Sequence, residues 1–170
     1  MANLWLEQHA GPLPSQLDVP SYISGYVDGE GCFSVSISPR PTLLVGWEVR
    51  PSLSVSQNAD RSEVLLLIQR YFGCGTPRPD RSDRTLKWEV RSLPLLIERV
   101  VPHFERYPLL SGKQRHFELF AEICWRMVSG DHRYVDGLRG IVTAANQMNP
   151  SGQRGYLAGQ IIESLSKVKA

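Results

Sequence analysis

The sequence predicts an α+β domain built on an antiparallel sheet, and three observations support this fold class. Two pairs of segments alternate apolar and polar residues with a period of two, as half-buried strands do. The stretches around them repeat apolar residues at helical spacing. The chain has 170 residues, which is long enough for one domain with a proper core. The order helix, two strands, helix, two strands, helices is typical of an antiparallel α+β arrangement.

Composition excludes several classes of protein. Hydrophobic residues make up 42% of the chain and charged residues 21%, which argues against disorder. No apolar run approaches the roughly 18 residues that a membrane span needs, and the N-terminus lacks the basic and apolar stretches of a secretory signal. Three cysteines without a CxxC pair argue against a disulfide framework or a zinc site. We therefore expect an intracellular, reducing compartment, either a bacterial cytoplasm or an organelle.

Charge alone leaves nucleic-acid binding open. The formal net charge is only +2, but 15 of the 19 basic residues are arginine. Arginine suits bidentate contacts with phosphate and guanine, although a GC-rich genome also raises the arginine content. The motifs must therefore decide the question.

Residues 1–19 carry Pro12 and Pro14, with Pro20 at their edge, and show no sustained period, so we expect an N-terminal arm there. Residues 20–168 are expected to form a single domain. Within this domain, apolar residues recur at helical spacing in several segments. They predict helices over Arg61–Tyr71, Leu93–Val101, Lys113–Val128, Asp136–Gln147 and Arg154–Lys167.

Two hairpins supply the expected sheet. Cys32–Arg40 alternates strictly, and the alternation resumes over Trp47–Ser56 after a turn. A second hairpin is expected over Thr76–Val90, with a charged turn at 80–84. The polar side of the first hairpin consists largely of short hydroxyls and carries few of the Lys and Glu residues that usually solvate an exposed sheet. This face is therefore a candidate binding surface.

The most informative part of the chain precedes the first strand. A short helix is expected over Tyr22–Asp28, with Asp18 or Ser21 as its N-cap. Gly29 and Gly31 are expected to end it and let the backbone turn.

That helix delivers Asp28 and Glu30, separated by one glycine, next to the polar strand. Ser24, Gly25 and Gly29 form a face of small residues that would let a second helix approach closely. Taken alone, the spacing is equally compatible with a helix end that carries two solvated acids.

The segment Ile23–Gly31 reads Ile-Ser-Gly-Tyr-Val-Asp-Gly-Glu-Gly and resembles the LAGLIDADG motif of homing endonucleases. Its first two letters are substituted conservatively, and its glycines and acids are in register. Three later stretches are similar to the family in the same order: the strand end at Gln57, the helix-to-strand junction at Tyr71–Gly75 and the region Pro102–Phe120. The resemblance covers about residues 21–125.

The resemblance implies an αββαββα fold whose saddle of antiparallel strands lies in the DNA major groove. Because only one motif is present, it implies a homodimer in which two motif helices pack together through Ser24, Gly25 and Asp28. Tyr156–Gln160 echoes the motif but lacks the acids that should follow, so we interpret it as ordinary helix.

The resemblance also implies a metal-dependent hydrolase. A divalent cation, Mg²⁺, would be held by Glu30 from each subunit and by the neighbouring Gly29 carbonyl. Asp28 is expected to act structurally at the helix end.

Two further active-site residues follow from the same comparison. Gln57 would hold a solvent molecule near the scissile phosphate. Lys113 would stabilise the charge of the transition state, with Arg115 and Ser111 as alternatives for that position.

Strands of about ten residues span roughly 33 Å, which is close to one turn of B-DNA. A dimer would therefore cover a long, near-palindromic target. The residues expected to contact DNA are Ser34, Ser36, Ser38, Arg40, Glu48, Arg50, Ser52, Ser54, Ser56, Arg78, Lys87 and Arg91.

The sequence therefore favours a site-specific double-strand endonuclease that acts as a homodimer, and the family resemblance implies a role in intron homing. The alternative is an intron maturase, with intron RNA as its partner, or a catalytically silent nucleic-acid-binding protein on the same fold. An unrelated α+β domain with a chance motif is the third interpretation.

Overall fold

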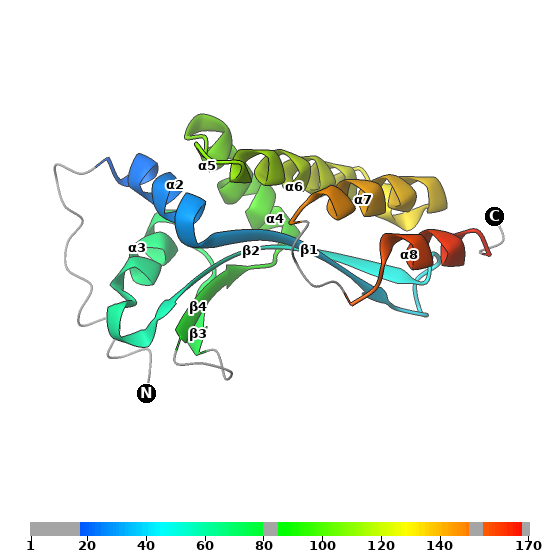
Figure 1. Ribbon diagram of the computed structural model, residues 1–170, viewed down its shortest axis with the longest axis horizontal. Coiled ribbons are helices and arrows are strands. Elements are labelled where there is room, and N and C mark those ends of the chain that lie inside the picture. Colours follow the sequence, from blue (N-terminus) through cyan, green and yellow to red (C-terminus); the bar gives the residue numbers. More distant parts are fainter. Residues whose placement is uncertain (1–17, 80–84, 150–154, 168–170) are drawn as a thin grey trace. The chain divides into compact units, whose positions relative to one another are not determined.

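The computed structural model describes residues 18–79, 85–149 and 155–167 (Figure 1). The chain divides into two compact units, Met1–Cys32 with Leu53–Ser111 and Phe33–Ser52 with Gly112–Ala170. Within these residues, the sheet consists of β1 (Gly31–Pro39), β2 (Trp47–Asn58), β3 (Thr76–Pro79) and β4 (Thr85–Val90). The strands are ordered β1-β2-β4-β3, and β4 pairs antiparallel with both β2 and β3. The predicted α+β class with an antiparallel sheet is therefore confirmed. In the part of the chain that the structure describes, no helix is long and apolar enough to cross a bilayer.

The first unit contains the motif helix, the end of the long second strand and the second hairpin. Its core is apolar: Leu53 and Val55 of β2, Ile68 of α3 and Trp88 of β4 have no exposed surface. The elements of this unit are α2 (Val19–Glu30), the later part of β2 (Trp47–Asn58), η1 (Ala59–Arg61), α3 (Glu63–Phe72), β3 (Thr76–Pro79), β4 (Thr85–Val90), α4 (Leu93–Leu95), η2 (Leu96–Val100) and α5 (Val101–Arg106).

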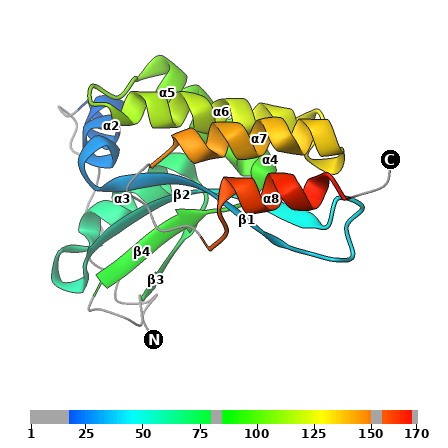
Figure 2. The same cartoon turned by 45° about the vertical axis from the view of Figure 1, so that its right-hand side comes forward.

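The second unit is a hairpin with a helical layer. The ring of Phe33 packs against Phe117 and Phe120, with ring centroids 5.5 and 5.2 Å apart. Helix α7 (Val135–Gln147) lies between α6 (Lys113–Val128) and α8 (Ala158–Leu165) in both views (Figures 1 and 2). The elements are most of β1 (Gly31–Pro39), the start of β2, α6 (Lys113–Val128), η3 (Asp131–Arg133), α7 (Val135–Gln147) and α8 (Ala158–Leu165).

Helix α8 is tied to the hairpin by Trp47. The indole N–H of Trp47 donates to the Ser164 hydroxyl at 2.8 Å, and its ring meets the edge of Tyr156. The stretch that echoes the motif therefore includes the start of an ordinary packing helix, as interpreted from the sequence. Arg154, the expected start of this helix, lies outside the described residues, as does the expected turn at 80–84.

The motif helix is longer than predicted. It spans Val19–Glu30 where the sequence suggested Tyr22–Asp28, and Asp18 is the N-cap, with its carboxylate accepting from the Ser21 N–H at 3.4 Å. The prediction that Gly29 ends the helix is wrong. Its φ is not positive, so nothing in its backbone interrupts the helical ladder. The arm predicted for 1–19 lies outside the described residues except for Asp18 and Val19, which begin α2.

Gly31 ends α2 by close packing. Its N–H donates to the Val27 carbonyl, and its backbone then becomes extended as β1 begins. A Cβ at Gly31 would lie 2.5 Å from Cγ1 of Val27 and 2.7 Å from its carbonyl oxygen. Only glycine therefore allows the helix to turn directly into the strand.

The helix predicted over Leu93–Val101 is irregular and extends to Arg106. It contains a π turn over Leu96–Val100, followed directly by α5. Pro102 has no N–H to donate, and its ring crowds the carbonyl four residues earlier, which favours this wider turn.

A buried hydrogen-bond network fixes α2 inside the first unit. The hydroxyl of Ser24 donates to the Tyr107 carbonyl at 2.7 Å and lies 3.1 Å from Nε2 of His103. The Tyr71 hydroxyl lies 3.0 Å from Nδ1 of the same ring. Because the Ser24 hydroxyl has a single proton, Nε2 must donate to it, and Nδ1 accepts from Tyr71. The network therefore requires a neutral His103.

We predict that this network loses stability in acid. Burial lowers the pKa of His103 to about 4 from its usual 6.5. Between pH 6.5 and 4, the His103 ring binds a proton in the unfolded chain but stays neutral in the folded chain. The free energy of unfolding therefore falls as the pH drops towards 4. The loss from this group is up to about 3 kcal/mol.

The measurement is urea unfolding at a series of pH values for the wild type and His103→Gln. Glutamine retains a donor for Ser24 but cannot titrate, so the variant should be less stable at pH 7 and show a shallower decline in acid. An unchanged slope between pH 6.5 and 4 in the variant would contradict this assignment.

Candidate active site

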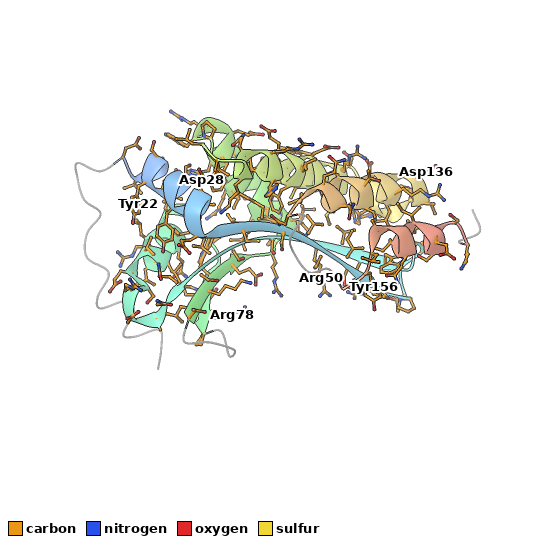
Figure 3. All side chains as sticks on the ribbon, viewed as in Figure 1. Tyr22, Asp28, Arg50, Arg78, Asp136 and Tyr156 are labelled. Carbon is orange, nitrogen blue, oxygen red and sulfur yellow. The ribbon has the colours of Figure 1, made fainter. Side chains whose placement is uncertain are left out.

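The two acids of the motif occupy the last turn of α2 but have different surroundings. Asp28 is half-buried and Glu30 is exposed. Figure 3 shows Asp28 near the end of α2 and Tyr22 nearer its start. Because α2 continues through Gly29, both acids lie within the helix, whereas the sequence predicted that the helix ends at Asp28, before Glu30.

Asp28 holds a neighbouring segment in place. Its carboxylate accepts from the backbone N–H groups of Leu110 and Ser111, each at 3.0 Å, and from the Ser111 hydroxyl. Three donors directed at one carboxylate fit the structural role expected from the sequence. The Ser111 hydroxyl, an alternative for the basic active-site position, is therefore engaged with Asp28.

One face of α2 has no cover from the described residues. A Cβ added to Gly25 or to Gly29 would meet nothing within 4 Å. Glu30 and both glycines are exposed, whereas Ile23 and Val27 have no exposed surface. The helix thus has one side built into the core of its unit and one side with room for a second helix. Of the residues predicted for the dimer interface, Gly25 lies on the open side, whereas Ser24 is buried and bonded to His103 and Tyr107.

Gln57 lies on the opposite face of the sheet from the serines. The register pairs Gln57 with Leu86 and Val55 with Trp88, so Gln57 continues the apolar row of β2. Its Nε2 donates to the Tyr26 hydroxyl at 2.5 Å, and its Oε1 accepts from the Asn58 N–H at 2.7 Å. The strand end therefore delivers this amide to the motif helix.

Tyr26 is a site residue that sequence reasoning missed. Burial raises the pKa of its phenol, the Gln57 hydrogen bond lowers it, and the negative charge of Glu30 raises it further. The phenol therefore remains protonated around neutral pH. The signal in the sequence was its place in the motif, four residues before Glu30 and so on the same helix face.

Lys113 belongs to the second unit, where it is the first residue of α6. It is half-buried, while Arg115 is exposed in the same first turn. Within the first unit the structure thus brings together Gln57, Tyr26 and Glu30. The basic candidates Lys113 and Arg115 belong to the second unit.

The polar row in the first unit is only partly exposed. Ser54 is opposite Glu89 and Ser56 is opposite Lys87, which in turn is opposite Arg78. Ser54 is buried, with 8% of its surface exposed, whereas Arg78 and Arg91 are exposed.

Acidic side chains on both hairpins hold basic neighbours. Glu89 lies 3.9 Å from Nζ of Lys87 and 2.9 Å from the Arg91 guanidinium. In the second unit, Glu48 lies 2.6 Å from both Arg40 and Arg50. Figure 3 labels Arg78 on β3 and Arg50 on β2.

The serines of the second unit bond to one another and to the backbone. The Ser34 and Ser52 hydroxyls are 3.1 Å apart, and the Ser36 hydroxyl donates to the Arg50 carbonyl at 3.4 Å. Ser52 is buried and Ser38 is half-buried. Short hydroxyls on this face therefore support the hairpin, whereas Arg40 and Arg50 are exposed.

A divalent cation would find oxygen donors at the end of α2. An exposed Glu30 carboxylate and the adjacent Gly29 carbonyl are the hard ligands that Mg²⁺ prefers. In the described ranges, no group of three or more His, Cys, Asp or Glu residues could hold a metal within one chain. The donor set fits such an ion, but one copy supplies only part of its coordination shell.

The comparisons with known proteins agree with this geometry. A family model described as LAGLIDADG endonuclease matches residues 23–124, more than half of the chain. The chain is 35% identical over 117 residues to homing endonuclease I-ApeII of Aeropyrum pernix, a match that covers 68% of each protein. It is 33% identical over 133 residues to probable intron-encoded endonuclease 2 of Neurospora crassa; the match covers 76% of this chain but only 29% of that relative.

Solved structures show the same fold. The crystal structure of the homing endonuclease I-TnaI matches with a TM-score of 0.76 and 31% identity, covering 88% of this chain and 97% of that one. The archaeal intron-encoded homing endonuclease I-Vdi141I, complexed with DNA, matches with a TM-score of 0.81 and 27% identity, covering 87% and 94%. The resemblance seen in the sequence is confirmed, and the chain belongs to the LAGLIDADG endonuclease family.

Proposed function

We propose that this chain is a site-specific homing endonuclease that makes a double-strand break in a long, near-palindromic DNA target, as a homodimer and with Mg²⁺. The observation that carries the proposal is the exposed Glu30 in the last turn of a LAGLIDADG motif helix. The relative I-Vdi141I, crystallised with DNA, supports duplex DNA as the substrate. The family match runs across both compact units, which supports one endonuclease domain over residues 20–168.

Glu30 and the Gly29 carbonyl would hold the cation. A bound divalent ion lowers the pKa of water and neutralises negative charge on the phosphate. Gln57 would orient a solvent molecule through its amide, and Lys113 would stabilise the developing charge. Asp28 would contribute indirectly, because its three hydrogen bonds fix the segment at Leu110–Ser111 against the end of α2.

A second copy would complete the site. Each chain offers one exposed motif carboxylate, and the open face at Gly25 and Gly29 has space for another helix. Close approach of two such faces would bring together two Glu30 carboxylates and supply ligands that one chain lacks. Two copies related by a twofold axis would also require a near-palindromic target.

Basic residues on the hairpins would contact the DNA. Arg40, Arg50 and Arg91 each have an acidic partner in the chain, so binding would exchange these ion pairs for phosphate or base contacts. Ser34, Ser36, Ser38, Ser52, Ser54 and Ser56 are short, and we propose that they contribute through water or by shaping the strand surface.

The proposal is tested by a cleavage selection with Glu30→Gln as the key variant. Purified protein and Mg²⁺ are offered a randomised duplex library, and the wild type should cut one long, near-palindromic site. Glu30→Gln should cut that site at least about a hundredfold more slowly because a metal ligand is lost, while its duplex affinity is retained. Glu63→Gln, which alters an exposed glutamate of α3, is the matched control.

EDTA should abolish cleavage by the wild type. A Glu30→Gln variant that still cuts would contradict the active-site assignment. Wild-type protein that retains duplex DNA or intron RNA without cutting would instead favour the maturase or binding interpretation.

Asp28→Asn should separate a structural role from metal binding. The amide presents a donor to groups that already donate, so the free energy of unfolding should fall by about 1–3 kcal/mol. The Mg²⁺ concentration for half-maximal cleavage should not change. Urea unfolding and a Mg²⁺ titration measure the two effects, with Asp60→Asn, at an exposed acid, as the control. A stable variant that needs more Mg²⁺ would make Asp28 a ligand.

Glu48→Gln should strengthen binding to non-specific duplex DNA by roughly threefold and steepen its salt dependence. The change removes a negative charge and releases Arg40 and Arg50 from their shared partner. Fluorescence anisotropy at several salt concentrations provides the measurement. Glu122→Gln, which breaks a comparable pair with Arg126 on α6, is the control. Equal effects of the two substitutions would argue against the β1–β2 hairpin as a DNA-facing surface.

A further inference from the structure

The side-chain amide of Gln57 is held at both of its polar atoms. The backbone N–H of Asn58 can only donate, so the atom 2.7 Å from it must be the amide oxygen. The amide nitrogen then lies 2.5 Å from the Tyr26 hydroxyl. The orientation of the amide, which is ambiguous for many glutamines, is therefore set by its two partners.

The direction of the second hydrogen bond follows from the first. An amide nitrogen has protons and no acceptor lone pair, so it donates and the Tyr26 oxygen accepts. The hydroxyl proton of Tyr26 is thus not used in this contact. It remains available to donate to a solvent or phosphate oxygen.

Tyr26 contacts Gln57 and lies one helical turn before the proposed metal ligand, Glu30. Tyr22, Tyr26 and Glu30 recur every fourth residue along α2 and share one face of the helix. The rings of Tyr22 and Tyr26 are 6.2 Å apart, and the Glu30 carboxylate acts electrostatically on the Tyr26 phenol. The helix face thus carries a phenol, held against the strand end, one turn before the acid.

A glutamine that positions a solvent molecule must have its side-chain amide held in one orientation. An amide that is not held can rotate and present either its donor or its acceptor to the same point. With one contact to Asn58 and one to Tyr26, the amide still has one nitrogen-bound hydrogen and one oxygen lone pair for a third group. Tyr26 and Asn58 together therefore decide which of these two groups faces the reaction.

We infer that Tyr26 is a positioning residue for the cleavage reaction, because its hydroxyl accepts from Gln57 and holds that amide in a single orientation against the helix face that carries Glu30. The inference rests on the proposed endonuclease function. It assigns to a residue of the motif helix a role that the motif's acids do not have.

Tyr26→Phe tests the inference, with Tyr22→Phe as a matched control one turn earlier. The Tyr22 side chain is exposed, and its loss of a hydroxyl should leave cleavage at the wild-type rate. Tyr26→Phe keeps the ring but removes the acceptor, so the single-turnover cleavage rate should fall about tenfold. The duplex dissociation constant and the Mg²⁺ requirement should stay the same.

A double variant distinguishes positioning from general structural damage. If Tyr26 acts through Gln57, then Tyr26→Phe combined with Gln57→Ala should cut no more slowly than Gln57→Ala alone. The NMR signals of the Gln57 side-chain amide protons provide a readout that does not need activity. Their protection from solvent exchange should be lost in Tyr26→Phe and retained in Tyr22→Phe.

Each outcome decides the matter. If the wild type cuts and Tyr26→Phe cuts at the same rate, the inference is overturned and the proposed function stays intact. The same conclusion follows if the rate losses of the two substitutions multiply in the double variant. Unchanged protection of the Gln57 amide protons in Tyr26→Phe would overturn it as well. No cleavage by the wild type would overturn the proposed function, and this inference with it.

Discussion

The first unit depends on the buried hydrogen bonds that join α2 to His103. Ser24 has a small side chain, and through His103 it connects the motif helix to Tyr71 on α3. Every donor and acceptor in this chain of contacts is satisfied only when the ring is neutral. Polar contacts of this kind are directional, so they fix the rotation of the helix more tightly than apolar packing alone would.

The fixed rotation explains how one short helix serves two purposes. Ile23 and Val27 face the core and have no exposed surface, while Gly25 and Gly29 leave an uncovered face with no Cβ. Glu30 is then exposed at the end of α2, next to a phenol that reaches the strand. A helix rotated by one residue would move Ile23 and Val27 out of their core positions.

The charged side chains of the two hairpins are arranged in the same way. An acidic residue sits between two basic ones on each, Glu48 in one unit and Glu89 in the other. These pairs are partly exposed, so they contribute little to stability. Their physical effect is to hold long basic side chains in defined positions and to lower the net charge of the surface, which is consistent with a total of only +2.

The sequence alone determined the fold class, the strand positions and the family. Period-two alternation is a local property, so β1 and β2 were found within about two residues, and the bounds of α6 agreed fully. It could not determine that α2 continues through Gly29, because a glycine is permissive and its neighbours decide its conformation. Nor did it reveal Tyr26 or the burial of Ser52 and Ser54. Those facts depend on contacts between residues far apart in the chain, such as Tyr26 with Gln57, and only the tertiary structure brings such residues together.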